Sequence, residues 1–219
     1  MILLNKPLFK GIDISKHQTA GKVNFKELKK LGYEFVMLRA GYGKEAWQKD
    51  PAFESHYKAA KEAGLKVGAY HYSYATDEGE ALQEAHCFLG WIKGKKLDYP
   101  VAFDIEDKCH KRLGREQCTN IALAFMTKVE EAGYYTMLYS YSSFIKKYLD
   151  MDALKHFDVW IAHYTSDERN IGKYYKGKYG MWQYSSSVVL PTVYKSRLDH
   201  NFAYKNYAEI IKRAKLNNL

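Results

Sequence analysis

Short apolar runs alternate with longer amphipathic segments along most of the chain. Apolar runs of about four to eight residues are typical of β-strands, whereas apolar positions three or four residues apart are typical of helices. We expect strands at residues 9–14, 35–40, 66–72, 100–107, 135–140, 158–162, 180–184 and 197–199. We expect helices at residues 24–31, 51–63, 77–92, 115–132, 144–157 and 202–214.

This alternation indicates parallel strands that are joined by crossover helices. About eight such strands favour a closed barrel over an open sheet, and a regular barrel of this kind needs about 250 residues. The chain has 219 residues, and the helical patterns between its later strands are weak. The expected fold class is therefore α/β, an irregular (β/α)8 TIM-like barrel. No linker, low-complexity tract or repeat interrupts the chain, so we expect residues 1–219 to form one domain.

The strand expected at residues 100–107 has two unlike faces. Val101, Phe103 and Ile105 form an apolar face, and Asp104 and Glu106 lie on the other. Paired carboxylates held close together are the usual groups for acid–base cleavage of a glycosidic bond. Acids at a strand end also cap loops or pair with lysine in many proteins, so the pair alone leaves both interpretations open.

Polar and aromatic residues gather at the expected strand ends, where barrels of this class carry their chemistry. They are Asp13, Arg39, Tyr72, Asp104, Glu106, Tyr139, Trp160, Tyr164, Gln183 and Asp199. The period of two places Asp13 and Trp160 on the inward side of their strands, because their apolar neighbours face outward. Three strand-end aspartates and a glutamate, ringed by aromatic side chains, favour a glycosidase-like site over core packing.

The charge of the chain bears on its partners. Lys and Arg number 34 and Asp and Glu 25, which gives a formal net charge of +9. Such an excess suggests nucleic acid, a membrane surface or an acidic wall polymer. The lysines are scattered, with short clusters at residues 93–96 and 146–147, and no nucleic-acid-binding signature accompanies them. We therefore expect a diffuse basic surface, with no nucleic-acid partner and no membrane partner.

Cysteine and histidine give no sign of a metal or a disulfide framework. Cys87, Cys109 and Cys118 lack zinc-ligand spacing, and their odd number predicts free thiols. His71 and His163 lack a third ligand on a shared face, so hydrogen-bonded packing is favoured for both. We expect no metal and no cofactor.

The ordered motifs of the chain carry a family likeness. They lie at residues 11–15 with Gln18 nearby, and at 35–43, 67–72, 100–106, 159–162, 181–184 and 198–201. In these segments the chain resembles the family 25 glycoside hydrolases, the lysozymes or N-acetylmuramidases of phage endolysins, bacterial autolysins and some fungi. The resemblance implies an irregular barrel that acts on bacterial peptidoglycan, and we expect a monomer. Anionic wall polymers are a second expected partner.

The resemblance also implies a role for each site residue. Glu106 is the general acid, Asp104 is its catalytic partner, and Asp13 and Asp199 are supporting acids in the same cleft. The expected substrate-binding residues are Tyr72, Tyr139, Trp160, Tyr164, Gln183 and Arg39, with Arg39 mainly organising the acids. One departure is His17, because relatives often carry tryptophan or another residue there.

The role of Asp104 stays open among a nucleophile, a base for water and a partner of the substrate acetamide. We favour the last, because two acids two residues apart can reach the bridging oxygen and the acetamide separately. Asp13 and Asp199 either hold Asp104 and water by hydrogen bonds or pair structurally with Arg39 or Arg197. A chitin hydrolase and a catalytically silent wall-binding module are the alternative functions.

The two ends of the chain shape expectations about its route to the wall. Residues 1–7 turn polar too soon for a signal peptide, and no apolar run approaches a membrane span. We expect synthesis in the cytoplasm, with action on the wall after phage-type lysis or an equivalent release. No wall-binding repeat follows the barrel, so targeting is expected from its surface, its basic charge or a partner.

Overall fold

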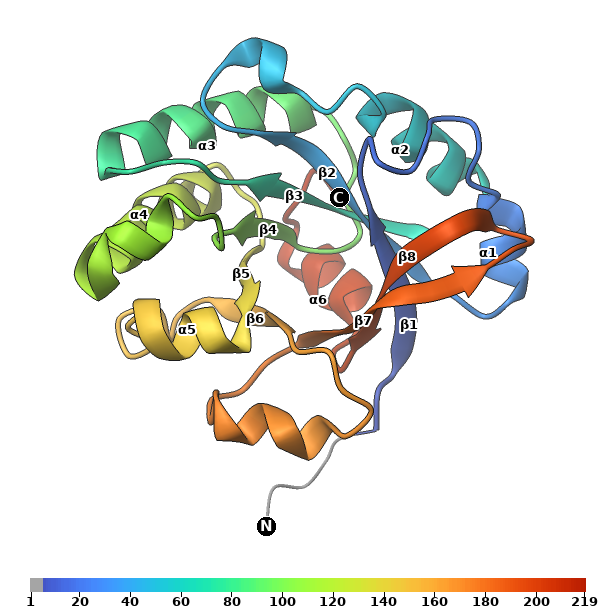
Figure 1. Ribbon diagram of the computed structural model, residues 1–219. Coiled ribbons are helices and arrows are strands. Elements are labelled where there is room, and N and C mark those ends of the chain that lie inside the picture. The colour runs from blue at the N-terminus through green and yellow to red at the C-terminus, as the bar shows by residue number, and fades with distance from the viewer. Residues whose placement is uncertain (1–5) are drawn as a thin grey trace.

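The computed structural model describes residues 6–219, which form a closed eight-stranded barrel (Figure 1). The strands are β1 (Phe9–Ile14), β2 (Phe35–Tyr42), β3 (Lys66–Tyr72), β4 (Val101–Asp104), β5 (Thr136–Tyr141), β6 (Asp158–Ala162), β7 (Met181–Leu190) and β8 (Tyr194–Ala203). The helices are α1 (Phe25–Lys30), α2 (Phe53–Glu62), α3 (Glu78–Ile92), α4 (Gly114–Glu131), α5 (Ser142–Tyr148) and α6 (Tyr207–Ala214). Short 3-10 helices are η1 (Ala46–Gln48), η2 (His110–Arg112) and η3 (Glu168–Lys173). The expected irregular α/β barrel is confirmed.

The last strand departs from the expected parallel arrangement. Strands β1 to β7 run parallel, whereas β8 is antiparallel to both β7 and β1. Only residues 191–193 separate β7 from β8, and so short a connection forms a hairpin rather than a helical crossover. The expectation of parallel strands throughout is therefore wrong for β8.

Two expected helices in the second half of the chain are too long. The helix expected at 202–214 begins only at Tyr207, because β8 continues to Ala203 and Asn206 caps the helix. The Asn206 side chain accepts a hydrogen bond from the Glu209 N–H, which satisfies one of the free donors of the first turn. The helix expected at 144–157 is reduced to α5, which ends at Tyr148 before a series of turns.

Strand residues alternate between the barrel interior and the core beneath the outer helices, as their period predicts. Val101 and Phe103 lie in the outer core, while Ala102 belongs to the cluster inside the barrel. Trp160 lies in the same inner cluster and is almost fully buried. The inward placement expected for alternate residues is thus confirmed on β4 and β6.

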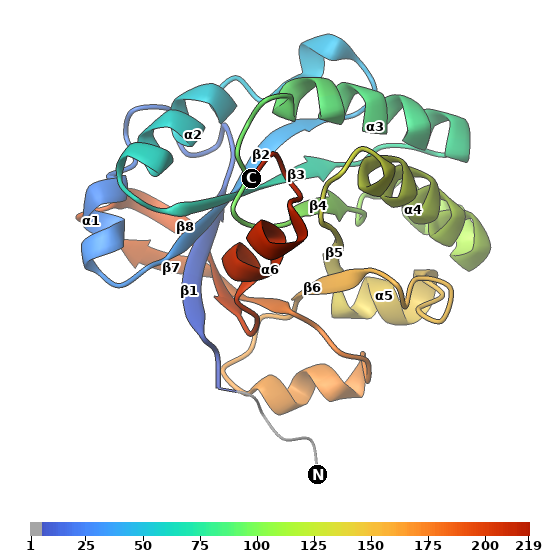
Figure 2. The same cartoon turned by 180° about the vertical axis from the view of Figure 1, so that it is seen from behind.

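Helix α6 closes one end of the barrel (Figure 2). Tyr207 and Ile211 of this helix are fully buried in the inner cluster, and the Tyr207 ring lies 5.6 Å from the Tyr99 ring. Because Tyr99 precedes β4, this is the end at which the parallel strands begin. The carboxyl ends of the strands lie at the opposite end of the barrel, away from α6.

Other expectations concern export and the thiols. Within residues 6–219, no helix combines the length and apolar character needed to cross a membrane. The three cysteines are free thiols. The expectation about a signal peptide falls largely on residues 1–5, which lie outside the described part of the chain.

Candidate active site

Four carboxylic acids from β1, β4 and β8 meet at the open end of the barrel. Asp13 lies near the end of β1, Asp104 ends β4, and Glu106 follows two residues later. Asp199 is directly opposite Asp13 across the antiparallel β1–β8 pair, which brings the two Cβ atoms within about 5.5 Å. Asp199 was expected at a strand end. It lies within β8 instead, because that strand runs in the opposite direction.

Asp104 is the least exposed of the four acids. It is 4% exposed, and its Oδ1 atom has no hydrogen-bond partner among the described residues. Burial raises the pKa of Asp104 well above its ordinary value, and the nearby charges of Glu106 and Asp13 add to the increase. Arg39 acts in the opposite direction. Asp104 therefore offers an unused acceptor atom to a group that enters the cleft.

Glu106 lies in the loop after β4 and is only partly buried. Burial raises its pKa to about 7, against the lowering effect of Lys111, while Asp107 and Asp199 raise it. Its Oε2 atom also lacks a hydrogen-bond partner among residues 6–219. Each charge of the neighbouring Asp104–Glu106 pair disfavours the other, so the pair holds a proton near neutral pH. The Asp104–Glu106 pair therefore places a proton donor at the end of β4.

Asp13 and Asp199 form a second pair of acids. Burial raises the pKa of Asp13 to about 8, and the Asp199 charge raises it too. Burial raises the pKa of Asp199 to about 6. Within the described chain neither acid forms an ion pair with Arg39 or Arg197, so that structural explanation is wrong. No hydrogen bond joins either acid to Asp104 in residues 6–219, so their expected support of Asp104 stays a prediction.

Two buried amides hold Asp13 in place. Gln183 Nε2 and Asn201 Nδ2 both donate to Asp13 Oδ2, at 2.8 and 2.7 Å. Gln183 Oε1 accepts hydrogen bonds from the hydroxyls of Tyr139 and Tyr164, at 2.8 and 3.0 Å. These two donors fix the orientation of the amide, which then presents its N–H to the carboxylate. Because Gln183 is only 2% exposed, it orients Asp13 and offers little surface to a sugar.

The aromatic residues of the site differ in exposure. Trp160 is 1% and Tyr139 6% exposed, and Trp160 Nε1 donates to Asn201 Oδ1 at 2.8 Å. These two rings lie beneath the site, and their expected contact with a sugar stays a prediction. Tyr164 is 44% exposed, and its hydroxyl contacts that of half-buried Tyr141 at 3.1 Å. Tyr164 is therefore an accessible ring beside the acids.

Tyr72 anchors the loop that carries Glu106. Its hydroxyl donates to Asp107 Oδ2 at 3.0 Å, and the Cys109 N–H donates to Asp107 Oδ1 at 3.0 Å. Tyr72 is also the register partner of Asp104 on the neighbouring strand. Because Asp107 directly follows Glu106, these bonds restrict where the glutamate can lie.

Arg39 is held by an acid outside the catalytic group. Its Nε donates to Asp50 Oδ2 at 2.8 Å, and Asp50 also accepts hydrogen bonds from the N–H groups of Lys16 and Ala52. From this position its charge still lowers the pKa of Asp104. The expected organising role of Arg39 is therefore confined to its charge, because its fixed partner is Asp50.

Three residues of the site were not given a role from the sequence: Asn201, Asp107 and Asp50. Asn201 lies two residues after Asp199 on the same strand, so the period of two was a usable signal. Asp107 adjoins the acid pair and could have been found there. Asp50 lies in a loop, and nothing in the sequence pattern marks it as the partner of Arg39.

The two histidines considered as metal ligands each lie beside a single polar side chain and not in a cluster of ligands. His163 Nδ1 lies 2.7 Å from Ser142 Oγ, in agreement with the expected hydrogen-bonded packing. His71 Nε2 lies 3.3 Å from Glu84 Oε2, but neither ring nitrogen of His71 has a hydrogen-bond partner among residues 6–219, so that expectation is wrong for His71. Among residues 6–219, no group of three potential ligands is positioned to hold a metal ion.

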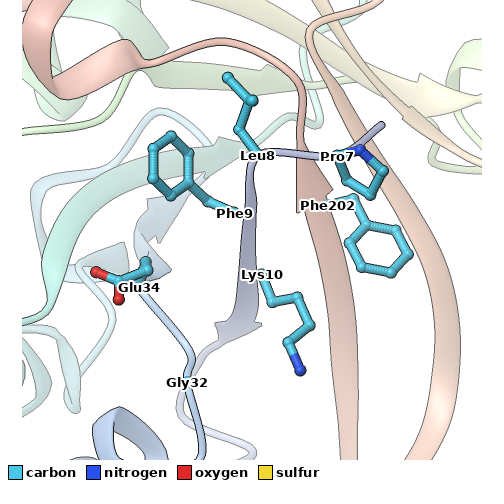
Figure 3. Close-up of a pocket in the computed structure, with 7 residues that line it drawn as sticks. All are labelled: Pro7, Leu8, Phe9, Lys10, Gly32, Glu34 and Phe202. Carbon is cyan, nitrogen blue, oxygen red and sulfur yellow. The ribbon is translucent and has the colours of Figure 1, made fainter. Parts of the chain in front are cut away.

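A separate hollow lies at the start of β1, at the opposite end of the strand from Asp13 (Figure 3). Its polar side chains include Lys10 and Glu34, which point to opposite sides in the close-up. Glu34 already pairs with Lys29 at 2.6 Å. The hollow has no pair of carboxylic acids and does not compete with the open end of the barrel as an acid–base site.

A closed barrel with a proton-holding glutamate beside a buried aspartate at the end of β4 is the architecture of a barrel glycosidase. The chain belongs to the glycosyl hydrolases family 25, whose model matches residues 12–193. The family that the motifs predicted is thus confirmed.

Individual relatives agree with this assignment. An autolytic lysozyme of Clostridium acetobutylicum is 34% identical over 178 residues, which cover 81% of this chain and 51% of that protein. The CTP1L endolysin has a TM-score of 0.79 at 28% identity, covering 94% of this chain and 70% of that one. The modular autolysin LytC from Streptococcus pneumoniae, solved with a synthetic peptidoglycan ligand, has a TM-score of 0.74 at 28% identity, covering 89% and 46%. The chain spans about half the length of the curated relative.

Proposed function

We propose that this protein hydrolyses bacterial peptidoglycan at the β-1,4 bond between N-acetylmuramic acid and N-acetylglucosamine. The observation that carries the proposal is the acid pair at the end of β4, in which burial raises the pKa of Glu106 to about 7. The relatives support the choice of substrate, since they include an autolytic lysozyme and an autolysin solved with a peptidoglycan ligand. Residues 1–219 are proposed to be the catalytic barrel, which acts at the cell wall after release.

In this proposal Glu106 protonates the leaving oxygen. A general acid must hold its proton at the working pH, and a pKa near 7 combines that with ready transfer. The neighbouring loop supports the task, because the Tyr72–Asp107 hydrogen bond restricts the segment that carries Glu106.

Asp104 is proposed to act on the substrate acetamide. Its buried Oδ1 atom has no partner within residues 6–219, and an acetamide N–H is a donor of matching chemistry. Once oriented in this way, the acetamide oxygen attacks the anomeric carbon as the leaving oxygen takes the Glu106 proton. Water then opens the resulting ring, and the product keeps the configuration of the substrate.

Product configuration tests this step. Proton NMR of the first-formed reducing end should show the retained anomer, and an inverted anomer contradicts any such two-step route. A substrate whose acetamide has been deacetylated should react far more slowly. An equal rate would assign Asp104 to direct attack on the sugar instead.

Fragment analysis tests the substrate. Peptidoglycan digested by the wild-type protein should give fragments with N-acetylmuramic acid at the reducing end by mass spectrometry. Chitin, treated in parallel, should stay intact. Glu106→Gln should release almost no fragments, whereas equal release by this variant would leave only a wall-binding module.

A further inference from the structure

The lysines of the described chain differ in whether a carboxylate lies close to them. Eight lysines between residues 29 and 128 lie within 4.0 Å of a carboxylate: Lys29, Lys30, Lys44, Lys49, Lys61, Lys66, Lys95 and Lys128. In contrast, no lysine from 146 to 178 forms an ion pair with any described residue. These six are Lys146, Lys147, Lys155, Lys173, Lys176 and Lys178. Residues 146–178 thus carry six lysines that no described carboxylate offsets, although other lysines, such as Lys22, Lys26 and Lys58, are also without an ion pair in the described chain.

Several of these lysines line a pair of adjoining hollows, which we call the basic groove. The larger hollow, of about 670 Å³, is lined by Lys155, Lys176, Lys178 and Lys205. A smaller hollow adjoins it and shares part of this lining.

 The volume of this smaller hollow is about 290 Å³, and it shares Tyr175 and Lys176 with the larger one.

The few acids of the basic groove leave its positive charge in excess. Together the two hollows are lined by six cationic side chains, which include Arg115 and Lys146, and by three aspartates. The charge of Asp158 is already used, because its Oδ2 atom accepts hydrogen bonds from Lys205 at 2.7 Å and from Tyr207 at 2.6 Å. Unpaired like charges that converge in a hollow repel one another, and an anionic ligand relieves that repulsion.

The place of the basic groove in the fold separates it from the cleft. Asp158 is the first residue of β6, Tyr135 precedes β5, and Lys205 follows the antiparallel β8. All three lie at the end of the barrel where the parallel strands begin, opposite the catalytic acids. Around the rim, α5 and the orange η3 segment lie next to each other in both views (Figures 1 and 2). A ligand in the larger hollow thus leaves the cleft open, and the smaller hollow continues from it along α5 and the start of α4.

We propose that the basic groove binds a polyanionic wall polymer of repeating polyol phosphates. Lysines are mobile point charges that suit phosphates strung along a flexible chain. Tyr135, Tyr175 and Phe157 add ring surface for the polyol or sugar units between the phosphates. The choice of a wall polymer over nucleic acid rests on the proposed function, since the polymer is attached to the same wall that the cleft would cleave. Binding it raises the local concentration of the enzyme at its substrate.

A charge-matched pair of variants tests the proposal. The groove variant is Lys155→Gln, Lys176→Gln and Lys178→Gln, and all three lysines are exposed. The control variant is Lys22→Gln, Lys26→Gln and Lys58→Gln, which removes the same charge from exposed lysines near α1 and α2. Sedimentation with purified walls is measured before and after acid extraction of the phosphate polymer.

Only the groove variant should bind polymer-bearing walls more weakly, by about tenfold or more at low salt. Wild type should lose a similar factor on extracted walls. Equal losses in the two variants, unchanged binding of the groove variant, or tighter wild-type binding to duplex DNA or anionic vesicles would each overturn the proposal.

Soluble glycan fragments free of the polymer separate this proposal from the proposed function. Wild type and both variants should hydrolyse these fragments at the same rate. If the fragments are cleaved normally but the groove variant binds walls like wild type, the basic groove proposal alone fails. If the groove binds the polymer but no glycan is cleaved, the proposed function alone fails.

Discussion

The four carboxylic acids of the site differ in what offsets their burial. Asp13 receives two amide N–H groups on one oxygen, whereas Asp104 and Glu106 each keep a buried oxygen without a partner in the described chain. Hydrogen bonds to a carboxylate favour its charged form, and their absence favours the protonated form. The acid pair of β4 is therefore suited to hold and release a proton, and Asp13 to stay fixed.

Activity should depend on pH through Glu106. The acid must be protonated to act, so kcat/KM should fall as the pH rises through about 7, the pKa to which burial raises Glu106. A rate profile on soluble glycan fragments measures this directly. A rate that keeps rising well above that pH would contradict the role of Glu106 as the acid.

Stability should depend on pH through Asp13. Folding raises the pKa of Asp13 from 3.8 to about 8, so the folded protein binds more protons than the unfolded chain between these values. The stabilisation is present below the lower value and is lost as the pH rises through the higher one. The Tm of wild type should fall over this range, and the fall should be smaller in Asp13→Asn. An equal fall in the variant would show that other groups cause it.

The loop after β4 gives a prediction about a single hydroxyl. Tyr72→Phe removes the hydrogen bond to Asp107 and should lower stability by about 1 kcal/mol. It should also lower kcat more than it raises KM, because Glu106 is then less well placed. The matched control is Tyr74→Phe, whose ring packs against Tyr72 but whose side chain is 45% exposed. Equal kinetic effects in the two variants would argue against positioning through Asp107.

Strand periodicity predicted most of the barrel and the inward direction of its acids, because alternation on strands such as β4 follows directly from burial. It failed for β8, where Tyr194, Lys195, Ser196 and Arg197 have no apolar alternation and only the short β7–β8 connection sets the direction. Long-range partners such as Asp50 for Arg39 were also beyond the sequence, since they depend on how loops pack.

The barrel as a whole depends on the helix that closes its base. Ile211→Ala in α6 should lower the free energy of unfolding by about 2–5 kcal/mol, because its side chain is fully buried in the inner cluster. Ile210→Ala is the control, since Ile210 is 37% exposed on the same helix. Urea unfolding measures both. Similar losses would mean that α6 contributes by its helical propensity rather than by closing the barrel.

The central claim is that Glu106 protonates the leaving oxygen while Asp104 orients the substrate acetamide. Its most direct measurement compares natural glycan with an activated aryl glycoside, whose leaving group needs no proton. Glu106→Gln should lose about a hundredfold or more on the glycan and little on the aryl glycoside, whereas Asp104→Asn should lose activity on both. Equal losses of Glu106→Gln on the two substrates would contradict the claim.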